Sequence, residues 1–173
     1  VNSASTTNLE IQTQSIFEAR STTLTIGGHA TNSGSFLSNT GTVVFDGPTQ
    51  QNVAGQWSGN NDFTDVVIRN SSQNGTTSSS VIFENAITTG GTFLVHGSSS
   101  VALAAGATST FFQLQLDGQS TSSEPVWLNS TESGVSAAIS SPSDVSANAV
   151  YVRDITACDT RSGFVFDSNG VDR

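Results

Sequence analysis

The chain has 173 residues and a net charge of −9, from 14 acidic side chains against five arginines and no lysine. Charged residues make up 11% of the sequence, against roughly 25% in ordinary soluble domains, so hydroxyl and amide side chains supply most of the polar surface. This acidic balance argues against nucleic-acid binding through a basic face. No apolar run reaches the roughly 18 residues of a membrane-spanning segment, so we expect no membrane insertion.

The pattern along the chain predicts many short β-strands and no helix. β-branched and aromatic residues form bursts of three to seven residues, and Gly, Asn and Asp turns separate them. No segment has the i, i+3, i+4, i+7 apolar spacing of an amphipathic helix. In chain order the predicted strands are 9–12, 22–26, 42–45, 52–54, 63–69, 81–83, 92–95, 101–103, 111–116, 126–128, 136–139, 149–153 and 163–166.

The strands recur about every 20 residues, which is typical of a repeating coil. A circuit of this length matches one turn of a parallel β-solenoid, in which one stack of inward apolar residues serves the whole domain. We therefore predict a single all-β domain over residues 1–173. The spacings that carry the prediction are 19 residues from Leu24 to Val43, 23 from Val44 to Val67, 26 from Val67 to Phe93 and 21 from Phe93 to Leu114.

An antiparallel β-sandwich of the pilin or adhesin type is the alternative architecture. The alternation of Phe112, Leu114 and Leu116 with glutamines suits a strand in either fold. Residues 1–14 match the repeat poorly, so they are expected to form an N-terminal cap of a solenoid or a strand exchanged between sandwich subunits.

Several segments resemble a module of very large secreted bacterial surface proteins. They include STTLTIGG at 21–28, TNSGSF at 31–36, TGTVVFDG at 40–47 and QQNVAG at 50–55. Residues 63–68 resemble the strand that follows this block, and 151–154 and 166–172 resemble its closing strands. The likeness is to the filamentous-haemagglutinin class of exported adhesins. It implies a right-handed parallel β-helix with an extracellular structural or adhesive role, and no catalytic residues.

Carbohydrate chemistry is the main alternative function, because polysaccharide-cleaving enzymes also use β-helices. Arg153, Asp154, Asp159 and Arg161 form the only dense charged cluster; it suits surface ion pairs or a catalytic group. Trp57 and Trp127 are candidate platforms for stacking on sugar rings, although core packing is the commoner role of tryptophan.

Cofactor and metal signals are weak. Asp167, Asn169 and Asp172 alternate loosely like the ligands of a calcium loop but lack the closing bidentate glutamate. His29 and His96 lie beside glycines at strand ends, with no third ligand at metal spacing. We expect no cofactor and, at most, a calcium ion.

Modification signals are common but unspecific. Asn70, Asn74 and Asn129 each begin an Asn-x-Ser/Thr sequon, the acceptor pattern for N-glycosylation. The lone Cys158 excludes an intrachain disulfide and is expected to be a small apolar residue in a strand.

Taken together, the sequence predicts a non-enzymatic structural or adhesive module of a bacterial cell surface. Its ends would be continued by more of a longer chain or pair end to end with another copy, as in a filament. Surface glycans are the candidate ligands. The alternative is a β-helix that binds or cleaves polysaccharide.

Overall fold

The structure is a computed structural model that describes residues 3–20, 22–118, 124–143 and 145–158. These residues form a β-solenoid of about six turns, which confirms the predicted architecture. Every strand pair among them is parallel, so the antiparallel sandwich is wrong. The described part contains one short 3-10 turn, η1 (Gly59–Asn61), and no α-helix.

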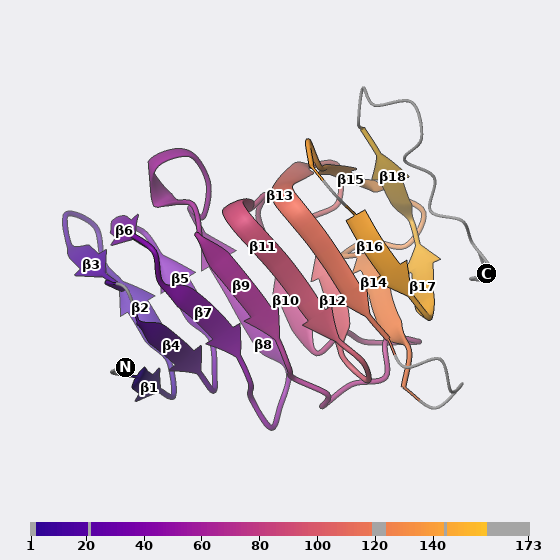
Figure 1. Cartoon of the computed structure of the whole chain (residues 1–173), viewed down its shortest axis with the longest axis horizontal. Coiled ribbons are helices and arrows are strands. Elements are labelled where there is room, and N and C mark those ends of the chain that lie inside the picture. The colour runs from indigo at the N-terminus through magenta and orange to yellow at the C-terminus, as the bar shows by residue number, and fades with distance from the viewer. Residues whose placement is uncertain (1–2, 21, 119–123, 144, 159–173) are drawn as a thin grey trace.

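Two long sheets run along the solenoid, and successive turns advance from β1 at one end to β18 at the other (Figure 1). The first sheet, here called sheet A, contains β1 (Ser3–Thr6), β4 (Thr23–Ile26), β7 (Thr42–Phe45), β9 (Asp65–Ile68), β11 (Thr88–His96), β13 (Thr108–Asp117), β15 (Ala137–Ser140), β16 (Val145–Asn148) and β18 (Ile155–Ala157). Sheet B contains β2 (Leu9–Ile11), β5 (Ala30–Asn32), β8 (Gln51–Gly55), β10 (Val81–Phe83), β12 (Ser100–Leu103), β14 (Val126–Ser130) and β17 (Val150–Arg153). A small third sheet pairs β3 (Ile16–Glu18) with β6 (Ser35–Leu37).

The core consists of apolar ladders that run from turn to turn. Alternate residues of a strand face the same side, so in-register parallel strands place like residues directly above one another. In sheet A the two inward ladders are fully buried: Leu24, Val43, Val66, Phe93 and Leu114, and Ile26, Phe45, Ile68, Val95 and Leu116. This arrangement explains how a chain with 35% apolar residues fills a core.

The strand register agrees with three of the four predicted spacings. Leu24 pairs with Val43, Val44 with Val67, and Phe93 with Leu114. The fourth was wrong by one residue, because Val67 pairs with Leu94. Both strands carry two adjacent apolar residues at this point, so hydrophobicity alone could not distinguish registers that differ by one residue.

Strand β13 also departs from the predicted alternation. Phe111 and Leu114 are both buried, whereas Phe112 is 52% exposed. The strand passes a corner of the solenoid: residues 108–110 pair with β15 and residues 114–117 pair with β16. The change of direction shifts the inward face by one residue, so Phe112 does not share a face with Leu114.

Residues 3–11 form part of the first turn of the solenoid. β1 pairs with β4, and β2 pairs with β5, both in parallel register and within the same chain. The described strands from Ser3 to Ala157 thus belong to one solenoid.

Polar side chains inside the corners complete the hydrogen bonding where the backbone turns. The fully buried Gln51 donates from Nε2 to the carbonyls of Ile26 (2.9 Å) and Gly28 (2.6 Å). Its Oε1 accepts from the backbone N–H of Gly47 and from Asn70 Nδ2, both at 3.0 Å. Burying an amide side chain without hydrogen-bond partners is energetically costly, and the four hydrogen bonds of Gln51 offset this cost.

Candidate functional site

The loop of residues 69–80, between β9 and β10, folds over the outer face of sheet B. Ser100 Oγ donates to the carbonyl of Gln73 (3.0 Å), and Asn129 Nδ2 donates to the carbonyl of Gly75 (3.1 Å). Arg153 Nη1 donates to the carbonyl of Thr76 (3.2 Å). The 69–80 loop therefore contacts three later turns, through β12, β14 and β17.

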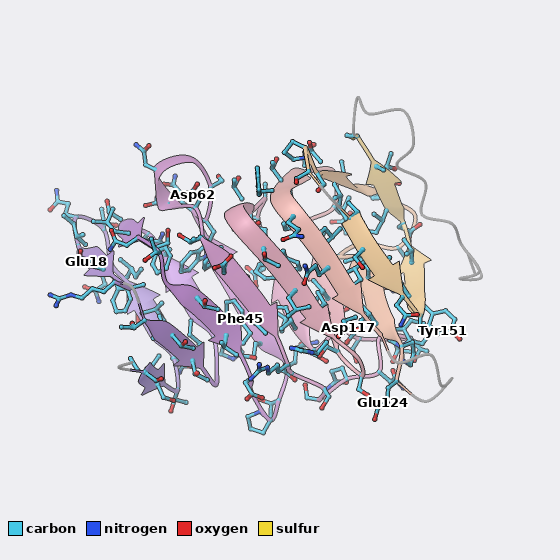
Figure 2. All side chains as sticks on the ribbon, in the orientation of Figure 1. Glu18, Phe45, Asp62, Asp117, Glu124 and Tyr151 are labelled. Atoms are coloured by element: carbon cyan, nitrogen blue, oxygen red, sulfur yellow. The ribbon has the colours of Figure 1, made fainter. Side chains whose placement is uncertain are left out.

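Two aromatic side chains stack beside this loop on the outer face. Trp127 of β14 pairs in register with Tyr151 of β17, and their ring centroids lie 4.3 Å apart with 21° between the planes. Both are partly buried. Figure 2 shows Tyr151 at the opposite end of the molecule from Glu18. The likeness of Val126–Trp127–Leu128 and Val150–Tyr151–Val152, one turn apart, is the sequence signal that points to this pair.

Cavities lie on both sides of the 69–80 loop, and Trp127 lines both. One has a volume of about 410 Å³ and is lined by Gly75, Thr76, Trp127, Asn129, Tyr151, Val152 and Arg153. The other has a volume of about 420 Å³ and is lined by Ser71, Ser72, Gln73, Asn74, Thr77, Ser98, Pro125 and Trp127. Both volumes fall within the roughly 300–1,000 Å³ of small-molecule sites.

Arg153 lies at this site without a carboxylate partner in the described part of the chain. No described acidic oxygen is within 4.0 Å of its guanidinium, and its buried Nε has no hydrogen-bond partner there. The neighbouring Asp154 has a different role, because its Oδ2 accepts the N–H of Gly134 at 3.0 Å. Asp159 and Arg161, the other members of the predicted cluster, lie outside the described residues.

Trp57 is not an exposed sugar platform. Its side chain is fully buried, Nε1 donates to the carbonyl of Ala54 (2.8 Å), and the ring stacks on Phe63 at a centroid distance of 4.9 Å. Of the two roles weighed for Trp57, the structure therefore gives it core packing. Trp127 remains a candidate, since the residue is only partly buried and lines two cavities.

The three sequons have different surroundings. Asn70 and Asn129 are buried, and their Nδ2 groups are occupied by hydrogen bonds, to the carbonyl of Thr49 (2.7 Å) and to that of Gly75 (3.1 Å). Neither amide is accessible for glycosylation in the folded chain. Asn74 is exposed, and its Oδ1 accepts from the hydroxyl of Thr76 at 2.7 Å.

The remaining candidates have structural roles or lie outside the described residues. His29 Nδ1 accepts the backbone N–H of Asn52 at 3.0 Å, and so links two turns. Cys158 is exposed just after β18, which corrects the expectation of a packed strand residue. The calcium-loop candidates Asp167, Asn169 and Asp172 lie outside the described residues.

Comparisons with known proteins found no protein-family model, no curated protein and no solved structure that matches the chain. The fold is compatible with a β-helix repeat module. In the described residues, no helix has the length and apolarity needed to cross a bilayer.

Proposed function

We propose that this chain is a structural or adhesive module of an extracellular bacterial surface protein, with a mechanical rather than a catalytic role. The solenoid supports this proposal because successive turns are joined by two long parallel sheets and by continuous apolar ladders. Such a stack resists bending and holds its two ends apart, as a spacer must.

The first turn gives the strongest support for this proposal, because its strands have no pairing partner on one side among the described residues. β1, β2 and β3 are the terminal strands of their sheets in the described residues, so each offers one edge of backbone N–H and C=O groups. Apolar side chains are exposed at the same end: Ile16 at 71% and Leu37 at 42%. Phe17 stacks on Phe36 at a centroid distance of 6.1 Å, the first contact of an aromatic series that continues into the core.

An end of this kind is satisfied by another turn of solenoid. We propose that this turn comes from more of the same polypeptide or from a second copy, which would give end-to-end association. We propose an extracellular location from the resemblance of segments such as TGTVVFDG at 40–47 to modules of secreted surface proteins.

Association is tested with the intact chain by light scattering coupled to size exclusion, and by electron microscopy at neutral pH. We expect concentration-dependent end-to-end oligomers, and we expect Ile16→Asp to abolish them by placing a charge at the open end. Phe112→Asp, at an exposed apolar residue of the β13 corner, is the matched control and should associate normally. Monomers at all concentrations would exclude pairing between copies. Equal association of both variants would show that the first turn is not the contact.

The location is tested separately. Antibodies raised against the purified module should label intact, unpermeabilised source cells. Labelling only after permeabilisation would contradict a surface location.

A further inference from the structure

We propose that the outer face of sheet B binds an acidic saccharide, through Trp127, Tyr151 and Arg153 beside the 69–80 loop. This site is separate from the open first turn, which lies at the opposite end of the solenoid (Figure 1). It therefore adds a ligand to the proposed structural role and does not depend on it.

The aromatic pair supplies the apolar surface. Sugar rings present C–H groups on their faces, and aromatic rings with accessible π-surface pack against them. One face of Tyr151 is covered by Trp127. Because β17 is the last strand of sheet B in the described residues, no described neighbour stacks on the opposite face. Tyr151 is thus the better-placed ring for stacking, and Trp127 lines both cavities beside it.

Arg153 sets the charge of the ligand. Arg153 lines the same 410 Å³ cavity as Tyr151, and its Nη1 donates to the Thr76 carbonyl. No carboxylate among the described residues forms an ion pair with it, so the guanidinium can pair with an anionic ligand there. A guanidinium fork binds a carboxylate bidentately, and the carboxylate of a uronic acid lies next to the ring that would stack on Tyr151.

The second cavity fits neutral parts of the same ligand. Its lining is mainly hydroxyl and amide side chains, from Ser71, Ser72, Gln73, Asn74, Thr77 and Ser98. These groups both donate and accept hydrogen bonds, as sugar hydroxyls require. Since Trp127 lines both cavities, we infer an oligosaccharide that places one acidic residue at Arg153 and a neighbouring residue across Trp127.

The test uses a tetramer of galacturonic acid and its fully methyl-esterified form as probes. Binding is followed by NMR on the two tryptophan indole N–H signals of the full chain. We expect the acidic tetramer to shift the Trp127 signal and leave that of the buried Trp57 in place. The ester, which lacks the charge, should bind about tenfold or more weakly, because a charge-assisted pair is lost. This comparison needs no change to the protein.

Variants test the same contacts from the protein side. Arg153→Gln should weaken binding about tenfold or more, whereas Arg20→Gln, at an exposed arginine of the first turns, should not change it. Tyr151→Phe should retain binding and Tyr151→Ala should lose it. An unchanged Trp57 signal verifies that each variant is folded. A tetramer concentration of about 10 mM detects binding with a dissociation constant in the millimolar range. Absence of any Trp127 shift at this concentration would overturn the proposal. Equal affinity for acid and ester would overturn it too.

Discussion

Single polar residues hold the corners of this solenoid together. Where the chain leaves one sheet, the ladder of backbone hydrogen bonds is interrupted, and side chains from an adjacent turn take over. Asn61 Oδ1 accepts the N–H of Phe36 (2.9 Å), and Asn85 Oδ1 accepts that of Gly55 (2.8 Å). Asp65 Oδ1 accepts that of Thr92 (2.7 Å). The many Asn and Gln residues are therefore structural as well as solubilising.

Gln51 should be the most sensitive of these residues to substitution. Gln51→Leu leaves the carbonyl of Gly28 and the N–H of Gly47 without this partner, and it removes one of the two donors to the carbonyl of Ile26, which also accepts the N–H of Asp46. We expect a loss of about 3 kcal/mol in the free energy of unfolding, measured by urea denaturation. Gln12→Leu, on the exposed surface, is the control and should change stability by less than about 0.5 kcal/mol. Equal effects would contradict a special role for the buried amide.

At the scale of elements, the 69–80 loop is the feature that departs most from a simple repeat. It joins β9 to β10, and besides its contacts with β8 of the preceding turn it reaches β12, β14 and β17 of later turns. Its tip comes close to Trp127: a Cβ added at Gly75 would lie 2.2 Å from the Trp127 Cβ, and Gly75 has a φ of +75°. Only glycine fits both the backbone conformation and the space.

Gly75→Ala should lift the loop from the sheet. Gly106 provides a matched control, since its φ is +68° but nothing lies within 4 Å of an added Cβ. Both alanine variants should lose about 1 kcal/mol from the positive φ. Gly75→Ala should lose at least about 1 kcal/mol more through the clash, and the NMR signal of the Trp127 indole should shift. If the two variants lose the same stability, the loop is not packed as described.

At the scale of the whole molecule, contacts between neighbouring turns and the longer-range 69–80 loop act together. A solenoid held only by neighbour contacts can unfold from its ends. Here the loop joins the fourth turn to the last described strand of sheet B, 77 residues away at Arg153.

We therefore expect the module to unfold as one cooperative unit. Trp57 reports on the core near the middle, and Trp127 reports on the later turns. In each of the variants Trp57→Phe and Trp127→Phe, the urea transition of the remaining tryptophan should coincide with that of far-UV circular dichroism. A fluorescence transition that precedes the loss of β-structure in either variant would show that the two halves unfold independently.

Much of the architecture was predictable because it depends on local pattern. The recurrence of Leu24, Val43 and similar residues indicated both the coil and most of its register. Prediction failed at the β13 corner, where Phe112 faces outward, and it missed the short strands β1, β3, β5, β6, β16 and β18. At a corner the inward face shifts from one residue to the next, and the alternation of apolar and polar residues in the sequence does not show where this shift occurs.

The sequence by itself indicated a repeating coil of short strands, because apolar bursts recur every 19 to 26 positions and stacked turns bury such bursts together. The parallel strand pairing of the tertiary structure then excluded the antiparallel sandwich. The tertiary structure alone decided the surface. Trp127 and Tyr151 pair one turn apart, but Thr76 joins them because a loop from an earlier turn folds over three later ones. The separation of 77 residues between Thr76 and Arg153 leaves no periodic trace in the chain.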